Sequence, residues 1–198
     1  MKYAYRQMTP RERTEVLAYR RSVKLPLHEP PHFGREDNLY LLTAANHEHK
    51  HIMRQESRRL EYEAKVLDLL AAIPSSELFA WCILPNHAHI LARVDLKAFG
   101  QKIGRLHNGL STQWNREDAS PGRTVWHRFS DRGIRNESHF FATLNYIHFN
   151  PVKHGHVEAM DYWRTSSIHI YLDQYGKDNM NLLTQQYPAL DYGKGWDW

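Results

Sequence analysis

The chain has 198 residues, of which 41% are hydrophobic and 24% charged, and it carries a formal net charge of +4 with a single cysteine. These values are typical of a soluble globular protein with one main domain, and they exclude collagen-like, disordered and disulfide-stabilised proteins. The longest apolar run, LFAWCIL at 78–84, is much shorter than the roughly 20 residues that cross a bilayer, so we expect a cytoplasmic protein without membrane contact.

The first part of the chain is strongly basic. Residues 1–24 hold seven Lys or Arg against two Glu, and Thr9-Pro10-Arg11-Glu12 has the cap, the first-turn proline and the acidic third residue of a helix start. Residues 26–34 contain three prolines and a glycine, which is typical of a linker. We therefore predict three parts: a basic N-terminal helix with its Pro-rich linker (1–35), a main domain (36–170) and an aromatic C-terminal tail (171–198).

The main domain has the pattern of an α+β fold. In chain order, the hydrophobic periodicity predicts a strand (38–46), a helix (49–73), two strands joined at Leu84-Pro85-Asn86 (77–94), a helix (96–116), a short strand (125–130) and a helix from Asn136 that ends before Pro151. This order indicates an antiparallel sheet of four to five strands with packed helices. Beyond Gly155 we expect less regular structure.

The second strand of the predicted hairpin carries two histidines. His87 and His89 are two positions apart, so both side chains leave the same face of the sheet, while Ala88 and Ile90 point to the other face. Two neighbouring imidazoles can share one divalent cation. By itself the pair is weak evidence, because a chain with 14 histidines is expected to contain an H-x-H somewhere.

The last predicted helix carries Tyr146 and Asn150, which are four residues apart and therefore lie on one helix face, one turn apart. Asn150 could offer an amide oxygen as a third metal ligand, and Tyr146 a phenol as a reactive group. The alternative is a half-buried tyrosine and an asparagine that ends the helix before Pro151.

Residues 101–136 form a second basic zone, with seven Lys or Arg against three acidic residues. Cationic side chains could contact the phosphates of single-stranded or hairpin DNA, and aromatic side chains could stack on its unstacked bases. The candidate DNA contacts are Arg105, Arg123, Trp126, Arg128, Arg132, Arg135 and, outside the zone, Lys153. The alternative is that the charges form an ordinary solvated surface and that Trp126 belongs to the core.

Three motifs in this order resemble the HUH single-tyrosine transposases, and within them the REP-associated tyrosine transposases of bacteria. They are LPNHAH at 84–89, a W-x-R and IRN pair at 126–128 and 134–136, and YIHFNPVKHG at 146–155. The resemblance covers about residues 37 to 193. One departure is Ala88, where the family has a bulky hydrophobic residue; this side chain faces away from the expected metal, so the change should affect packing.

The resemblance implies a ferredoxin-like fold, metal binding by His87, His89 and Asn150, and Tyr146 as the nucleophile. The cofactor would be Mg²⁺ or Mn²⁺. The implied function is that of a metal-dependent single-stranded DNA endonuclease and strand transferase, which acts on REP-like hairpin DNA through a 5′-phosphotyrosine intermediate. We further expect a monomer associated with the bacterial nucleoid.

Two other functions compete with this interpretation. A non-catalytic protein that binds single-stranded or hairpin nucleic acid would keep the basic zones but would not need Tyr146 beside a metal. A metal-dependent hydrolase would use water as the nucleophile and would release free DNA ends.

Overall fold

The computed structural model describes residues 9, 11 and 38–189. The chain divides into two compact units, Met1–Phe33 and Gly34–Trp198, and residues 38–189 belong to the second unit. The predicted basic helix and Pro-rich linker lie outside the described residues, apart from Thr9 and Arg11, and so do the last nine residues of the aromatic tail. The predicted division into three parts stays a prediction.

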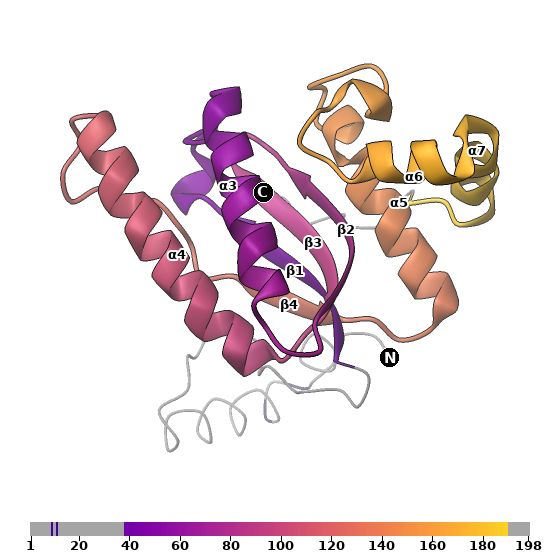
Figure 1. Cartoon of the computed structure of the whole chain (residues 1–198), viewed down its shortest axis with the longest axis horizontal. Helices are drawn as coiled ribbons and strands as arrows, with labels where there is room; N and C mark the ends of the chain where they lie inside the picture. The colour runs from indigo at the N-terminus through magenta and orange to yellow at the C-terminus, as the bar shows by residue number, and fades with distance from the viewer. Residues whose placement is uncertain (1–8, 10, 12–37, 190–198) are drawn as a thin grey trace. The chain divides into compact units, whose positions relative to one another are not determined.

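A four-stranded antiparallel sheet forms the centre of the described fold (Figure 1). Its strands are β1 (Leu39–Ala45), β2 (Glu77–Ile83), β3 (His87–Arg93) and β4 (Ser130–Gly133), in the order β2-β3-β1-β4. The predicted α+β class with an antiparallel sheet is therefore confirmed, and so is the hairpin of β2 and β3. The last strand begins five residues later than predicted, because Trp126 makes only a single bridge, to Asn46, and regular pairing with β1 begins at Ser130.

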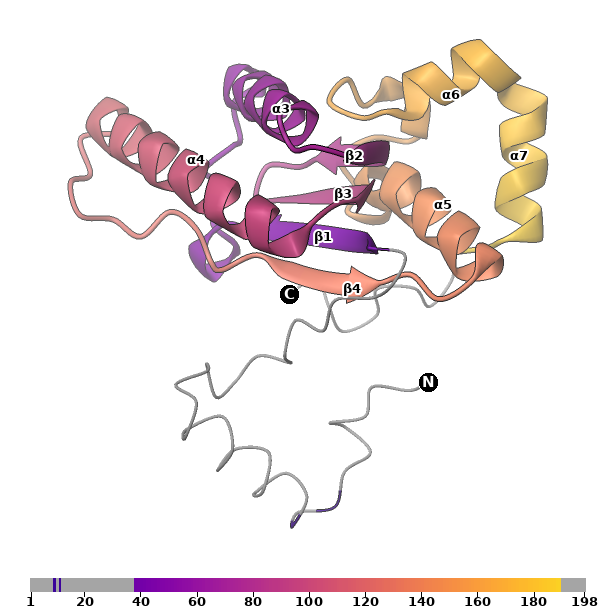
Figure 2. The ribbon, with the colours of Figure 1, turned by 60° about the horizontal axis from the view of Figure 1, so that its bottom comes forward.

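Helices cover both faces of this sheet (Figure 2). On one face lie α3 (Glu56–Ala71) and α4 (Leu96–Glu117). On the other lie α5 (Glu137–Lys153), α6 (Ile168–Tyr175) and α7 (Lys177–Gln186). No helix in the described part of the chain is long and apolar enough to cross a membrane.

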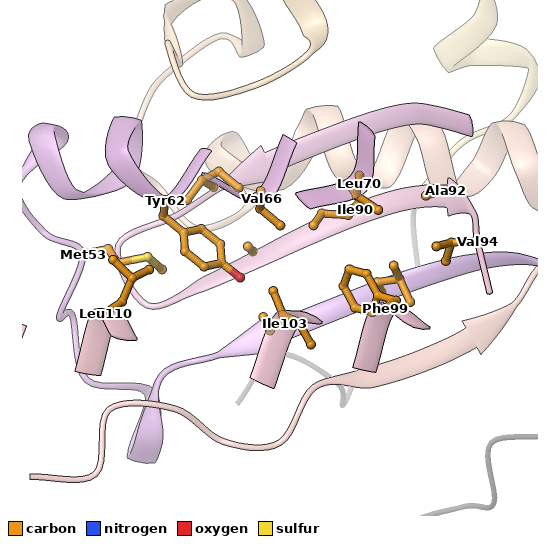
Figure 3. Close-up of a cluster of buried hydrophobic side chains, with 14 of the residues drawn as sticks. Met53, Tyr62, Val66, Leu70, Ile90, Ala92, Val94, Phe99, Ile103 and Leu110 are labelled. Atoms are coloured by element: carbon orange, nitrogen blue, oxygen red, sulfur yellow. The ribbon is translucent and has the colours of Figure 1, made fainter. Parts of the chain in front are cut away.

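The core is divided into two layers by the alternation of side chains along the strands. Ile90 and Ala92 of β3 pack with Tyr62 and Val66 of α3 and with Ile103 of α4 (Figure 3). The opposite face of β3 contributes Leu91 to the second cluster, which contains Leu144 and Ile147 of α5. Because β3 is buried on both faces, α5 can approach one face of this strand closely.

Two helix boundaries differ from those predicted. The helix predicted from residue 49 begins at Glu56, because the Met53 N–H donates to the Pro85 carbonyl and so ties the preceding segment to the β2–β3 turn. A 3-10 helix, η1 (His47–His49), lies before it. The helix predicted to end before Pro151 continues to Lys153. Gly155, which follows the C-cap residue His154, has a φ of +70° that glycine readily adopts and that ends the helix.

The chain after Gly155 is more regular than expected, since it forms α6 and α7. Both are short, and each buries one apolar side chain in the second cluster, Ile168 from α6 and Met180 from α7. Helices of this length are marginal without tertiary packing, so these buried contacts stabilise them.

An ion-pair cluster joins the beginning of α3 to the end of α4. The guanidinium of Arg58 is buried, donates to both carboxylate oxygens of Asp118 at 2.9 and 2.6 Å, and reaches Glu117 at 3.0 Å. Arg123 donates to the same Asp118 carboxylate at 2.8 Å. These two guanidinium groups lower the pKa of Asp118 to about 2.

We predict that Asp118→Asn lowers the free energy of unfolding by about 1 to 3 kcal/mol at pH 7, because it weakens charge-assisted hydrogen bonds to a buried cation. The depressed pKa of Asp118 means that its contribution is complete above the ordinary carboxyl pKa of about 4 and is lost as the pH falls toward the folded-state value. Urea unfolding of both proteins at several pH values between 7 and 3 measures this.

The matched control is Asp68→Asn, which removes an exposed carboxylate from α3. It should change the unfolding midpoint little at any pH. A difference between wild type and Asp118→Asn that stays constant from pH 7 to pH 3 would contradict the assigned role of Asp118.

Candidate functional site

The four residues expected to form the catalytic centre lie together at the start of β3, against α5. His87 Nε2 is 3.0 Å from Asn150 Oδ1, and His89 Nε2 is 3.1 Å from the Tyr146 hydroxyl. The two imidazole ring centroids are 4.8 Å apart. All four side chains are buried, with at most 4% of their surface exposed.

Strand alternation and helical spacing explain which of these groups meet once α5 packs on β3. His87 and His89 alternate with Ala88, so they face α5, while Ala88 packs in the cluster under α3 and α4. Tyr146 and Asn150 are one helical turn apart on α5, and so each lies beside a different histidine.

Two neighbouring side chains orient the imidazoles. Asn86 Oδ1 is 2.8 Å from His87 Nδ1, and Thr43 Oγ1 is 2.9 Å from His89 Nδ1. The Asn86 amide nitrogen donates to the His49 carbonyl, which leaves its oxygen to accept from His87. An imidazole that donates through Nδ1 keeps a lone pair on Nε2, which is the state that a metal ligand requires.

The donor set at this site fits a divalent cation. With the Nδ1 proton on His87, the Nε2 lone pair faces the carbonyl oxygen of Asn150, and two acceptors at 3.0 Å repel each other unless a cation lies with them or the amide is rotated. The amide nitrogen of Asn150 is buried and has no hydrogen-bond partner among the described residues. Within residues 9, 11 and 38–189, no group of three His, Cys, Asp or Glu could hold a metal. The Asn150 amide oxygen could complete a set of three protein ligands with the two imidazoles.

Two further side chains border the site on α5 and directly after it. Lys153, which was expected to contact DNA, places its ammonium 4.9 Å from the ring centroid of Tyr146. The ring of His154 lies 5.1 Å from that of His87.

Sequence reasoning did not identify Thr43, Asn86 or His154 as neighbours of the site. The position of Asn86 next to His87, and of His154 four residues after Asn150, could have suggested two of them. Thr43 gives no local signal, because it meets His89 only through the pairing of β1 with β3.

The other predicted DNA contacts do not gather at this site. Arg123 pairs with Asp118, and Trp126 is stacked on His107 at 4.0 Å with an interplanar angle of 4° and on Tyr62 at 4.9 Å. These contacts give Arg123 and Trp126 structural roles. Of the remaining candidates, Arg132 is half-buried and the others are exposed: Arg105, Arg128 and Arg135. Contact of any of these residues with DNA, Arg123 and Trp126 included, stays a prediction.

Some of the 14 histidines are structural. His107 accepts or donates a hydrogen bond with the Tyr62 hydroxyl at 3.0 Å, and His148 does so with Ser167 Oγ at 2.9 Å. Burial lowers the pKa of each to about 3, so both are neutral at physiological pH.

Comparison with known proteins gives the following relatives. No family model matches the chain. A Haemophilus influenzae protein named "Putative REP-associated tyrosine transposase" is 32% identical over 119 residues, which is 50% of this chain and 66% of the relative. The REP-associated tyrosine transposase of Escherichia coli K12 is 28% identical over 99 residues, or 47% of this chain and 54% of the relative. The chain thus matches less than two thirds of the length of either relative.

A solved structure supports the same relationship at the level of the fold. It is described as a REP-associated tyrosine transposase bound to a REP hairpin, and it is similar to this chain with a TM-score of 0.55 and 22% identity, over 71% of this chain and 82% of the other. At this identity the similarity shows a shared fold. The resemblance predicted from the motifs is therefore confirmed, and the chain is related to the REP-associated tyrosine transposases and has their fold.

Proposed function

We propose that this protein cleaves and rejoins single-stranded DNA beside a hairpin, with Tyr146 as the nucleophile and a divalent cation as cofactor. The observation that carries the proposal is the buried cluster in which the Tyr146 hydroxyl lies 3.1 Å from His89 Nε2, beside His87 and Asn150. A structural tyrosine would not require two oriented imidazoles and an amide oxygen at the same place.

The residues that would hold the cation are His87 and His89, through Nε2, and Asn150, through its amide oxygen. The expected ion is Mg²⁺ or Mn²⁺, of which Mn²⁺ accepts imidazole more readily. When bound, such an ion withdraws negative charge from a phosphate and fixes its orientation.

The proposed reaction on the protein uses Tyr146 in two steps. Its oxygen attacks the phosphorus, the bond to the 3′ oxygen breaks, and that oxygen leaves as a 3′-hydroxyl after gaining a proton. The phenol proton passes to water or to a DNA oxygen. A second 3′-hydroxyl then attacks the phosphotyrosine, releases Tyr146 and joins the new strand, so that the phosphodiester is conserved.

For a phosphate to reach the buried Tyr146, the Lys153 side chain that lies over the ring would have to move. This side chain is long, is exposed at the surface, and places its ammonium over the Tyr146 ring. A phosphate that approaches the ring would attract the ammonium, and the Lys153 side chain would move with it. Its positive charge would then stabilise the negative charge that develops during attack.

The choice of hairpin DNA as the partner is supported by the relatives. Two curated relatives are named REP-associated tyrosine transposases, and the similar solved structure is described as bound to a REP hairpin. The exposed Arg105, Arg128 and Arg135 add positive charge that can contact phosphates. We also propose, as expected from the sequence, that the protein is a monomer and acts in the cytoplasm.

The first test is a covalent adduct. Incubation with a labelled hairpin oligonucleotide that carries a single-stranded flank, in the presence of Mn²⁺, should give a protein–DNA band on a denaturing gel. Tyr146→Phe should give none, because it lacks the attacking oxygen. The control Tyr162→Phe, which removes the hydroxyl of an exposed tyrosine, should retain the band.

Two outcomes would refute the mechanism. An adduct formed by Tyr146→Phe would exclude Tyr146 as the nucleophile. Binding of the hairpin by wild type without any adduct would favour the non-catalytic DNA-binding protein, whereas free cleaved ends without an adduct would favour the hydrolase.

The second test concerns the cation. We predict that Asn150→Ala abolishes both Mn²⁺ binding, measured by calorimetry, and adduct formation, while hairpin affinity stays near that of wild type. Thr43→Val, which removes only the partner of His89 Nδ1, should weaken Mn²⁺ binding about 10- to 100-fold.

Asn108→Ala is the matched control for the loss of an amide, since this residue is exposed on α4. It should bind Mn²⁺ and form the adduct like wild type. Unchanged Mn²⁺ affinity in Asn150→Ala would show that the amide is not a ligand.

A further inference from the structure

A row of aromatic rings continues from the candidate metal ligands toward the surface. The His154 ring lies 5.1 Å from that of His87, the His156 ring 6.3 Å from that of His154, and the His51 ring 6.4 Å from that of His156. His154 and His156 are half-buried, and His51 is exposed. The row therefore joins the buried site to solvent.

Trp163 extends this row to one side and is held firmly. Its ring is stacked on His156 at 5.4 Å with an interplanar angle of 26°, and its indole N–H donates to the Ile83 carbonyl at 3.0 Å. The guanidinium of Arg59 lies 4.8 Å from the indole centroid. Arg59 is itself fixed by donation to the carbonyls of Met53 and Arg54.

Separate segments of the chain supply these side chains. His51 lies before α3, Arg59 lies on α3, His156 follows α5, and Trp163 follows the 3-10 helix η2 (Met160–Tyr162). Ile83, whose carbonyl accepts the hydrogen bond from Trp163, is the last residue of β2. The aromatic row and the candidate metal ligands thus lie at the same end of the β2–β3 hairpin.

Arginine side chains border the row. Arg54 and Arg164 are exposed, and Arg164 lies 3.6 Å from Glu56 at the surface. Burial, together with the charges of His51 and Arg59, lowers the pKa of His156 and so favours its neutral form. The histidines of this row are partly or fully exposed to solvent, unlike the structural histidines His107 and His148, which are buried.

We propose that the histidine row, defined as His51, His154, His156 and Trp163 with Arg59, binds the unpaired nucleotides next to the phosphate that is cleaved. Bases would stack on the imidazole rings, while Trp163, covered by His156 and Arg59, would hold the row in place. The exposed Arg54 and Arg164 would contact the backbone phosphates. Such stacking is tolerant of sequence, so the row would hold the strand rather than select bases. The inference rests on the proposed function, since it takes the cluster around His87 as the cleavage site.

The test measures binding without chemistry, in a Tyr146→Phe parent. Fluorescence anisotropy compares three labelled hairpin oligonucleotides, which carry a short unpaired tail on the 5′ side, on the 3′ side, or no tail. Addition of His51→Ala and His156→Ala should weaken binding of one tailed hairpin about 5-fold or more and leave the tailless hairpin unchanged.

Two controls keep the result specific. His139→Ala removes a half-buried histidine near the other end of α5 and should not alter tail-dependent binding. His51→Ala alone changes only an exposed side chain, so it should fold like the parent and still lose part of the tail effect.

The inference is overturned if a tail does not raise the affinity of the parent, or if the double variant binds tailed and tailless hairpins as the parent does. These outcomes are separate from the adduct test in protein that retains Tyr146. If an adduct forms but the tail has no effect on affinity, only the proposed role of the histidine row is refuted. If the tail raises affinity but no adduct forms, the proposed cleavage is refuted.

Discussion

β3 is paired on both edges, with β1 and with β2, and covered by helices on both faces, and the position of every candidate catalytic group depends on this arrangement. Its register sets His87 opposite Ala45 and His89 opposite Thr43. A shift of the strand by one residue would turn both imidazoles into the apolar layer under α3 and α4, where polar groups without partners are costly. The burial of Ile90 and Ala92 in that layer therefore stabilises the direction in which the histidines point.

The same register also positions the two side chains that hydrogen-bond to the histidines. Thr43 reaches His89 Nδ1 only because β1 lies beside β3, and Asn86 reaches His87 Nδ1 because it occupies the turn before that strand. Both contacts direct the Nε2 atoms toward α5, where Tyr146 and Asn150 lie. The site is thus assembled from a strand paired on both edges and a helix packed on its face, which would hold the proposed reactive groups in place before DNA binds.

The features that could be predicted from the sequence depend on local patterns. Strand alternation predicted the β2–β3 hairpin and the common face of His87 and His89, and helical spacing placed Tyr146 beside Asn150. The late start of α3 could not be predicted, because it depends on a bond from Met53 to Pro85 more than thirty residues away. Thr43 was missed for the same physical reason, since it lies 46 residues from His89 in sequence. The positive charge of Arg123 predicted DNA contact; its ion pair with Asp118, five residues earlier, depends on how the loop after α4 folds, which residue spacing does not reveal.

Tyr146, beside His87, His89 and Asn150, is proposed to form a covalent bond with DNA. Mass spectrometry of the protein digested after incubation with hairpin DNA and Mn²⁺ locates the modified residue. We expect a nucleotide attached by its 5′ phosphate to the peptide that contains Tyr146, and to that tyrosine within it. Attachment to another residue, or complete cleavage of the DNA with an unmodified Tyr146 peptide at every time point, would exclude Tyr146 as the nucleophile.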